Sequence, residues 1–346
     1  MDATIVRAGM PAEPLLSVRG LHTRFYKDDT VIHAVNGMSL DLWPGEVLGV
    51  VGESGCGKSV TALSILRLIP RAAGRVVDGE IRFEGRDLLA LSPRELAEVR
   101  GRDISMIFQE PMTSLNPVLR IGDQVAETLQ LHKGMSRRAA WDRAVELLER
   151  VRIADPARQA REYPHRLSGG MRQRVMIAMA LACSPRLMIA DEPTTALDVT
   201  VQAQILELMA DLNRQTGAAM MLITHDLGVV AEMAHRVIVM YAGNTVEEAK
   251  VEELFANPLH PYTRGLMAAI PRRGAWRDSA APQALQEIPG MVPSLRAPVV
   301  GCAFAPRCAH ATARCATQAP PMQTRANGHA VACWEADHME QLGRPA

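Results

Sequence analysis

Three features are missing from this sequence of 346 residues: an excess of charge, a long apolar run and a closely spaced pair of cysteines. The 38 basic residues equal the 38 acidic residues, whereas a dedicated binder of duplex DNA usually carries a basic excess, so we expect no nucleic-acid partner. No run reaches the ~18 consecutive apolar residues of a membrane-spanning helix. The stretch "MDATIVRAGMPAEPLL" lacks the basic segment and apolar core of a signal peptide. We therefore expect a cytosolic protein that reaches a membrane only through partners.

The third absence concerns the cysteines. Four of the six crowd the C-terminal region: Cys302, Cys308, Cys315 and Cys333. Zinc sites favour pairs of the C-x2–4-C type, whereas the intervals here are C-x5-C-x6-C, followed by seventeen residues before the last cysteine. In a reducing compartment such a cluster suggests a metal more than disulfides, and the wide spacing favours four thiolates around an iron–sulfur cube. Zinc, and free thiols or disulfides, are the alternatives, and His310 or His329 could replace a cysteine as a ligand.

What is present is an alternation of strands and helices. Strands are predicted within residues 15–51, where the apolar run "EVLGVV" is typical of a strand buried on both faces, and a helix is predicted from about Lys58 to Leu68. The segment "ISMIFQ" predicts a further strand that ends at Gln109. Later strands, "RLMIAD", "AAMMLITH" and "HRVIVMYAG", alternate with helices such as Val201 to Gln215, which indicates a largely parallel sheet with helices on its faces.

Two regions have a different character. Residues from about 113 to 183 contain three helical runs, from which we predict an inserted helical subdomain. The apolar stripe of the second run comprises Ala144, Leu147, Leu148 and Val151. Residues 271–325 are rich in proline, alanine and arginine with little periodicity. We expect this segment to be an appended tail that is not part of the sheet.

The segment "GESGCGKS" matches the pattern G-x-x-x-x-G-K-[ST] of a phosphate-binding loop, and it leaves an apolar strand and opens a helix, as this motif requires. Its glycines let backbone N–H groups point at phosphate oxygens, and the helix N-terminus adds partial positive charge. Lys58 would reach the β- and γ-phosphates and Ser59 would ligate Mg²⁺; a chance glycine turn is the alternative. The predicted nucleotide contacts here are Gly52, Ser54, Gly55, Cys56, Gly57, Lys58, Ser59 and Val60.

The segment "LMIADEP" ends an apolar strand in two carboxylates. Ligands of α/β sheets bind at the carboxyl ends of strands, so Asp191 would hold the magnesium, directly or through water. Glu192 could polarise the attacking water, and a general base of this kind contributes about 10²–10⁴-fold in rate. The alternative is an acidic pair that merely ends a strand.

Gln109 and His225 also follow apolar strands. Gln109 precedes the turn-rich segment "EPMTSLNP" and could touch the metal or the water. His225, in "LITHDLG", could bond the γ-phosphate, although a lone histidine at a strand end is more often simply solvated. Its spacing after Asp191 favours the functional interpretation.

The segment "LSGGMRQR" predicts a second anion site. Ser168 is placed to cap a helix that begins near Met171, and Gly169 and Gly170 expose N–H groups at its positive end; an ordinary capped helix is the alternative. This site ends the helical insertion and cannot easily fold back onto the loop of its own chain. We expect it to close on the γ-phosphate held by another copy or a sister subunit, so that two chains facing head to tail sandwich two nucleotides.

Together, "GESGCGKS", "FQEP", "LSGGMRQR", "LMIADEP", "TTALD" and "THD" in this order resemble the ATP-binding cassette (ABC) family over about residues 15–325. The resemblance implies an α/β P-loop NTPase fold with a mixed or parallel core sheet, an antiparallel β subdomain, an inserted α-helical subdomain and a Cys-rich C-terminal extension. It implies an ATPase in which Lys58, Ser59 and Asp191 bind MgATP and Glu192 is the catalytic carboxylate.

The resemblance assigns further residues by position. Gln109 and His225 would sense the γ-phosphate, Asp198 would face the opposite subunit, and the segment Ser168–Gly170 would complete the partner's nucleotide site. An aromatic side chain before the P-loop usually stacks on adenine. Phe25 is our choice, with its neighbour in the sequence, a tyrosine, as the alternative.

The segment "YPHRLSGGMRQRVMIAMALACSPRLMIADEPTTALDVTVQAQI", with "NPLHPYTRGLMAAIP" and "IPGMVPSLRAPVVGCAFAPRCAHATARC", is similar to the ATPases of oligopeptide/dipeptide importers, more to their D-type than to their F-type subunit. The resemblance implies a cassette at residues 15–270 and an extension at 271–346, whose four cysteines are associated with a [4Fe–4S] cluster. Implied partners are an F-type sister or a second copy, two integral-membrane permeases and a periplasmic or extracellular substrate-binding protein. The implied location is the cytoplasmic face of the cell (inner) membrane.

Two other functions stay open at this point. Related cassettes power importers of nickel, glutathione and other small solutes, because specificity lies in the permeases and the external binding protein. Soluble cassette ATPases act in DNA repair or on ribosomes, but they usually carry two cassettes in one chain or a long coiled-coil insertion. This sequence has one cassette, a short helical insertion and no heptads.

Overall fold

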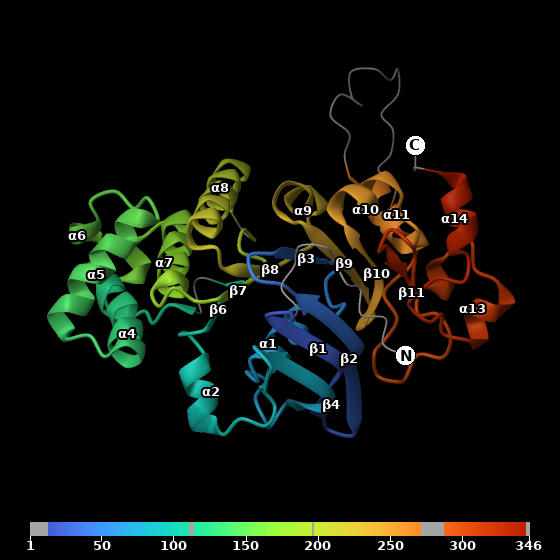
Figure 1. Cartoon of the computed structure of the whole chain (residues 1–346), viewed down its shortest axis with the longest axis horizontal. Coiled ribbons are helices and arrows are strands. Elements are labelled where there is room, and N and C mark those ends of the chain that lie inside the picture. The colour runs from blue at the N-terminus through green and yellow to red at the C-terminus, as the bar shows by residue number, and fades with distance from the viewer. Residues whose placement is uncertain (1–12, 111–113, 196, 271–286, 344–346) are drawn as a thin grey trace, which may run out of the picture.

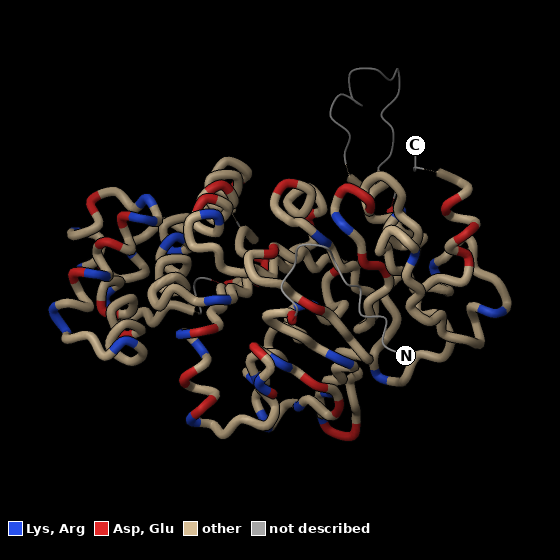
Figure 2. The backbone as a smooth tube through the Cα atoms, in the orientation of Figure 1, with Lys and Arg blue, Asp and Glu red and all other residues tan. Residues whose placement is uncertain are grey.

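The computed structural model describes residues 13–110, 114–195, 197–270 and 287–343, arranged around two β-sheets (Figure 1). Basic and acidic residues are interspersed along the helices at the left of the view rather than separated by sign (Figure 2). In the described part of the chain, no helix is both long and apolar enough to cross a membrane.

The smaller sheet is antiparallel and has the order β2-β1-β4-β5. Its strands are β1 (Leu16–Lys27), β2 (Thr30–Leu42), β4 (Gly74–Phe83) and β5 (Arg86–Asp87). Because side chains alternate along a strand, Leu16 and Val18 of β1 lie on one face, where both are fully buried. The predicted antiparallel part of the fold is confirmed.

The larger sheet has eight strands in the order β11-β12-β10-β9-β3-β8-β7-β6. In that order they are β11 (Gln323–Thr324), β12 (Ala330–Val331), β10 (Asn244–Lys250), β9 (Arg236–Tyr241), β3 (Val47–Val51), β8 (Ala219–Thr224), β7 (Leu187–Asp191) and β6 (Ile104–Ile107). The strands from β9 to β6 are parallel, and β10, β12 and β11 are antiparallel to their neighbours. Strands β3, β7, β8 and β9 are wholly buried, as parallel strands covered on both faces should be. The mixed sheet is therefore confirmed.

Alternate residues of the parallel strands serve two cores. Ile189 of β7 and Ile223 of β8 face a core that they share with the first helix and the smaller sheet. Their neighbours Met188 and Leu222 face a second core on the opposite side of the sheet. The helices packed on the larger sheet include α1 (Lys58–Ile65), α8 (Val199–Thr216), α9 (Leu227–Met233), α10 (Val251–Ala256) and α11 (Pro261–Ala268). Because β3 and β7 are packed from both sides, the loops at their carboxyl ends begin from well-anchored positions.

Between β6 and β7 the described residues form helices joined by turns and no strand, and these helices lie together at the left of Figure 1. They are α4 (Ile121–Lys133), α5 (Arg137–Arg150), α6 (Pro156–Gln159), the 3-10 turn η1 (Pro164–Arg166) and α7 (Gly169–Leu181), and α2 (Pro93–Val99) comes just before β6. Ser136 caps α5 by accepting a hydrogen bond from the Ala139 N–H. The apolar stripe expected on α5 is buried, including Ala144 and Leu147.

The C-terminal segment contains η2 (Ala305–Arg307), α13 (Ala313–Thr317) and α14 (Ala336–Leu342) besides its two short strands. The expectation that residues 271–325 stay outside the sheet is wrong, because β11 lies in that range and pairs with β12, which in turn pairs with β10. The outer backbone groups of β10 need hydrogen-bond partners, and these strands supply them. Strands of two residues are too short to leave a periodic pattern in the sequence.

Two predicted boundaries are also corrected. Helix α1 ends at Ile65 rather than near Leu68, because Arg67 adopts a left-handed φ of 50°, which a continuing helix cannot contain. Strand β6 ends at Ile107, so Gln109 lies two residues beyond the strand. The pairing of β6 with β7 stops there, and the apolar Phe108 that extended the pattern is exposed.

Candidate active site

The loop Gly52–Ser59 joins buried strand β3 to helix α1. A Cβ on Gly52 would lie 2.3 Å from the Met240 carbonyl oxygen, and one on Gly57, whose φ is 103°, would lie 2.5 Å from the Ala34 carbonyl oxygen. Glycine is the residue that fits both places. The loop therefore wraps the N-terminus of α1, where backbone N–H groups and the helix dipole favour a phosphate.

The other predicted loop residues divide by exposure. Ser54 and Gly55 are exposed at the loop tip, Val60 packs partly against the core, and Cys56 is fully buried. Burial raises the pKa of the Cys56 thiol, so this side chain acts as a small apolar filler. The tip is free to meet a ligand, and the buried residues hold its shape.

Lys58 is almost completely buried, and no carboxylate pairs with it in the described structure. Its Nζ donates hydrogen bonds to the carbonyl oxygens of Gly52, at 2.8 Å, and Glu53, at 3.1 Å. The ammonium group therefore lies inside the curve of the loop, held by dipoles and not by an opposite charge. A polyphosphate bound in the loop would supply that charge.

Ser59 and Asp191 meet although they lie in different motifs. The Ser59 hydroxyl donates to Oδ1 of Asp191 at 2.9 Å. Asp191 ends β7 and is buried, and burial raises its pKa to about 6, against the opposing effect of the Ser59 hydrogen bond. Two oxygen donors side by side fit Mg²⁺, which binds through carboxylates, hydroxyls and water.

Glu192 is the centre of the second cluster. Its Oε2 accepts hydrogen bonds from Gln109 Nε2 at 3.1 Å and from the Thr195 hydroxyl at 2.9 Å, and its Oε1 lies 3.5 Å from Nδ1 of His225. Its backbone has a left-handed φ of 46°, an uncommon conformation for a residue with a side chain. Gln109 and His225, which follow the different strands β6 and β8, are therefore both brought to this carboxylate.

Thr195 is a contact of Glu192 that the sequence reasoning missed. It lies three residues after Glu192 within "TTALD", a motif that was recognised without a role for this threonine. A hydroxyl three residues beyond a carboxylate in a turn is a usual local hydrogen-bond donor, which is the signal that could have identified it.

The second anion site has the geometry of a capped helix. The Ser168 Oγ accepts a hydrogen bond from the Met171 N–H at the start of α7, and Ser168 and Gly169 are exposed. A Cβ on Gly170 would lie 2.6 Å from Cγ1 of Val201, so this glycine lets α7 pack against α8. Asp198 caps α8 by accepting from the Val201 N–H at 3.0 Å. Both caps face outward, and within the described ranges neither is hydrogen-bonded to the phosphate-binding loop.

The two candidates for the adenine-stacking ring are placed differently. Phe25 is partly buried against Gly74, whose Cβ would come within 2.8 Å of the Phe25 ring. Tyr26 is 39% exposed, and the Arg75 guanidinium lies over its ring at 5.2 Å from the centroid. The choice of Phe25 stays a prediction.

The four C-terminal cysteines line one small cavity, together with His260, His310 and Glu335 among others. The pKa of the Cys333 thiol is raised to about 12, mainly by burial and to a smaller extent by the other three thiols. Among the described residues, no group of three or more histidine, cysteine, aspartate or glutamate side chains is arranged to hold a metal ion. His329 does not line this cavity: it is buried against Glu247, with Nε2 at 2.7 Å from Oε1, so its suggested role as a substitute ligand is wrong.

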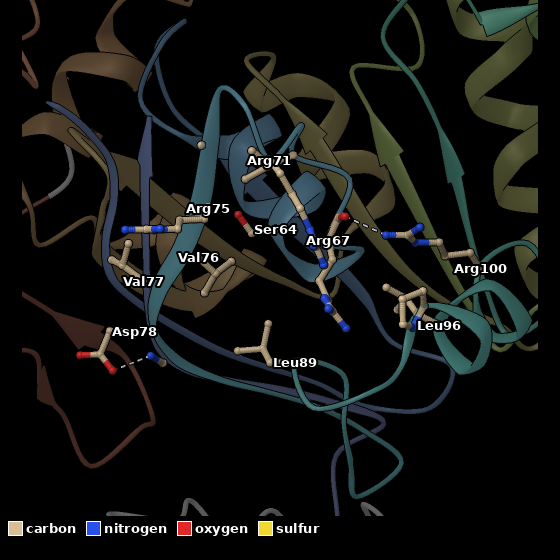
Figure 3. Close-up of a pocket in the computed structure, with 14 residues that line it drawn as sticks. Ser64, Arg67, Arg71, Arg75, Val76, Val77, Asp78, Leu89, Leu96 and Arg100 are labelled. Atoms are coloured by element: carbon tan, nitrogen blue, oxygen red, sulfur yellow. Dashed lines mark hydrogen bonds between the residues drawn. The ribbon is translucent and has the colours of Figure 1, made fainter. Parts of the chain in front are cut away.

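A different cavity of about 650 Å³ lies between α1, β4 and α2 (Figure 3). Four arginines line it, and within the described residues none of the four forms a salt bridge: Arg67, Arg71, Arg75 and Arg100. Figure 3 shows the Arg67 side chain extending into the space, with Arg75 pointing away from it. Arg67 and Arg100 donate only to backbone carbonyls, and burial lowers the pKa of Arg100. No predicted nucleotide contact lines this cavity, which we call the arginine groove.

Comparison with known proteins agrees with this geometry. Residues 35–195 match the family "ABC transporter", and residues 246–315 match "Oligopeptide/dipeptide transporter, C-terminal region". A solved dimer of the ATP-binding cassette MJ0796 in a post-hydrolysis state, bound to ADP and Pi, aligns with a TM-score of 0.61 and 30% identity over 68% of this chain and 98% of that chain. The fold and the site define a P-loop ATPase of the ATP-binding cassette class.

Full-length relatives narrow the assignment. A probable peptide ABC transporter ATP-binding protein of Sinorhizobium fredii is 57% identical over 96% of this chain and 98% of its own. The oligopeptide transport ATP-binding protein AppD of Bacillus subtilis is 51% identical over 92% and 96%, and OppD of Salmonella typhimurium is 48% identical over 97% and 98%. The chain belongs to the ATP-binding subunits of ABC transporters, in the oligopeptide/dipeptide transporter group.

Proposed function

We propose that this ATPase powers the import of oligopeptides or dipeptides through a membrane transporter. The observation that carries the ATPase part is the meeting of Ser59 with Asp191, and of Gln109, Thr195 and His225 with Glu192, at the carboxyl ends of parallel strands. The peptide part is supported by the matching C-terminal region and by the names of the relatives.

Each cluster has one task in the proposed reaction. The loop N–H groups and Lys58 bind the β- and γ-phosphates, and Ser59 and Asp191 hold Mg²⁺, which supplies charge neutralisation for phosphoryl transfer. Glu192 accepts the proton of the attacking water. The Thr195 hydroxyl and the Gln109 amide hold its carboxylate at hydrogen-bond distance. His225, largely exposed beside it, is free to donate to the γ-phosphate.

We further propose that two cassettes complete one another's sites. The support is that Ser168 and Gly169 expose a helix N-terminus without bonding to their own phosphate-binding loop, and that Asp198 is exposed nearby. The related MJ0796 cassette was solved as a dimer. The partner is an F-type sister subunit or, failing that, a second copy, and ATP-driven closure brings the segment Ser168–Gly170 onto the partner's γ-phosphate.

The remaining parts of the chain have proposed places in the transporter. Residues 15–270 form the cassette, with a helical subdomain at about 113–183, and residues 271–346 form the extension. The cassette attaches to two integral-membrane permeases at the cytoplasmic face of the inner membrane, and an external binding protein delivers the solute. The arginine groove is a candidate permease contact, because its guanidinium groups form no salt bridge with any residue that the structure describes, and because α2 is followed by β6 and then Gln109.

For the four cysteines we propose a [4Fe–4S] cluster, with zinc as the alternative metal. The support is that all four thiols converge on one cavity, that none is in a disulfide, and that four cysteines are the usual ligand set of such a cube. A cube takes one thiolate at each iron, so its ligands stand farther apart than those of a single ion. Its role would be structural, holding the irregular backbone of the extension together.

The test of the transport function is reconstitution with the two permeases and the second ATPase in proteoliposomes. ATP-dependent uptake of a labelled dipeptide or pentapeptide, absent with Glu192→Gln, is the expected result. Uptake of Ni²⁺ without peptide uptake would indicate that the transported solute is a metal ion and not a peptide. ATP hydrolysis without membrane partners or uptake of any solute would instead indicate a soluble cassette ATPase.

A further inference from the structure

Glu53, the second residue of the phosphate-binding loop, is held at three points. Its carboxylate accepts two hydrogen bonds from Arg307, from Nη1 to Oε2 at 2.6 Å and from Nη2 to Oε1 at 3.0 Å. Its N–H donates to the Tyr262 hydroxyl at 2.8 Å, and its carbonyl oxygen accepts from Lys58 at 3.1 Å. Carboxylate, N–H and carbonyl of this one residue are therefore all fixed at the point where β3 gives way to the loop.

Arg307 comes from the C-terminal extension, 254 positions further along the chain, and is itself firmly held. It is 7% exposed, its Nε donates to the Pro289 carbonyl oxygen at 2.8 Å, and its guanidinium lies over the rings of Tyr241 and Phe304 at 5.7 and 5.9 Å from their centroids. A planar guanidinium that binds both oxygens of a carboxylate fixes its direction as well as its charge.

The charge of Glu53 matters because of where it lies. A carboxylate at the start of a phosphate-binding loop repels a polyphosphate and competes for Lys58 in the same loop. In this structure the carboxylate is instead turned to Arg307, and Lys58 donates to the carbonyl oxygens of Gly52 and Glu53 and lies 3.9 Å from the Cys56 sulfur. The guanidinium thus cancels the one acidic side chain of the loop and keeps it away from the phosphate site.

The attachment of the extension to the cassette has other sources. Strand β12 pairs with β10, and the buried Glu247 of β10 accepts hydrogen bonds from the Leu259 and His260 N–H groups while lying 2.7 Å from His329 of the extension. The extension is therefore anchored at a second place that does not involve the loop. Losing the Arg307 pair should leave the extension docked, so an effect on nucleotide binding can be separated from unfolding.

We propose that Arg307 is a positioning residue for nucleotide binding: it pairs with Glu53 and thereby keeps the phosphate-binding loop shaped and charged to accept MgATP. This inference rests on the ATPase site and requires neither peptide transport nor a metal at the cysteines. It makes the C-terminal extension part of the nucleotide site's support.

The test uses the full-length chain and its affinity for MgADP, measured by titration calorimetry, with the KM and kcat of ATP hydrolysis as a second readout. Arg307→Gln should weaken MgADP binding and raise KM about tenfold, within the range usual for coupled sites, with a smaller effect on kcat. Arg307→Lys keeps the positive charge but cannot bind both carboxylate oxygens of Glu53 in the same way. Its affinity for MgADP should lie between those of the wild type and Arg307→Gln. Arg325→Gln is the matched control, because it removes an arginine that pairs with Asp337 within the extension. It should bind MgADP with wild-type affinity.

The double variant Glu53→Gln/Arg307→Gln distinguishes charge positioning from simple packing. With the carboxylate removed, most of the lost affinity should return, although the packing lost with Arg307 does not. Limited proteolysis should find the extension docked in all variants. Wild-type affinity in Arg307→Gln, or a double variant no better than Arg307→Gln alone, would overturn the proposal. If Arg307→Gln does not fold, wild-type affinity in Arg307→Lys would do the same.

Discussion

The hydroxyl of Ser59 donates a 2.9 Å hydrogen bond to the carboxylate of Asp191, joining the phosphate-binding loop to strand β7 across 132 positions of sequence. The two groups that would share a magnesium ion thus already lie next to each other. Burial raises the pKa of the Asp191 carboxyl and the neighbouring Glu192 adds to the rise, whereas the Ser59 hydrogen bond and the Lys58 charge oppose it. A magnesium ion held by these two groups would relieve the electrostatic cost of burying the carboxylate.

Asp191→Asn should stabilise the free protein while abolishing its response to magnesium nucleotide. The folded-state pKa of about 6 exceeds the ordinary value of 3.8. The folded state therefore binds this proton more tightly than the unfolded state, and stability is lost as pH rises from about 3.8 through 6. Above pH 6 the full cost, up to roughly 3 kcal/mol, is present and the asparagine removes it. Thermal unfolding should show a larger gain at pH 8 than at pH 5; equal gains would contradict the explanation.

Glu192→Gln should lower ATP turnover by at least about 10²-fold, because the general base is lost, and leave MgATP binding near wild type. Thr195→Val is the graded comparison: it keeps the carboxylate but removes one hydrogen bond that holds it, worth about 1.5–3 kcal/mol to a charged group. Steady-state hydrolysis and equilibrium binding of ATP measure the two effects. Wild-type turnover in the glutamine variant would exclude Glu192 as the base.

Gly169→Asp should leave the fold and nucleotide binding of the single chain intact and abolish turnover. A side chain at Gly169 meets only Cδ2 of Leu197 at 3.4 Å, and an acidic residue in the first turn suits the dipole of α7. The new carboxylate would repel a partner's γ-phosphate. Unchanged melting temperature and MgATP affinity, with loss of hydrolysis and of ATP-dependent association, are the expected readings. Full ATPase activity in this variant would contradict the proposal that two cassettes complete one another's nucleotide sites.

Anaerobically purified protein should be brown and contain iron and sulfide at about four each per chain, as a single four-iron cube requires. Cys308→Ser should lose the colour and the iron, because Cys308 lines the shared cavity. Cys183→Ser, a buried cysteine outside that cavity, is the control and should keep both. Colourless protein that contains stoichiometric zinc would show that the four cysteines bind zinc and not a [4Fe–4S] cluster.

The residues that sequence reasoning located most readily are those whose geometry is local. The phosphate-binding loop, which includes Lys58, follows β3, and two carboxylates stand at the end of β7; an apolar run marks each of these strands. Because parallel strands present their carboxyl ends at one edge, Gln109 and His225 could be expected near Glu192 without any knowledge of distances. Both were found at its carboxylate.

What the sequence did not reveal depends on long-range packing in irregular chain. The composition of residues 271–325 does not predict that Gln323 and Thr324 join the sheet, because a strand of two residues is too short to show the alternation of apolar and polar residues. Arg307 looks like one more arginine in a proline-rich tail, and its partner Glu53 occupies a position that the loop motif leaves open. Such pairs follow from where the tail docks, which tertiary contacts decide.

The two short strands of the extension have a consequence for handling the protein. With residues beyond 270 removed, β10 would become the last strand of the sheet, and Glu247, at present buried against His329, would border on solvent. An uncovered strand offers its free amides and carbonyls to other molecules. A cassette without these residues should therefore aggregate at concentrations at which the full-length chain does not.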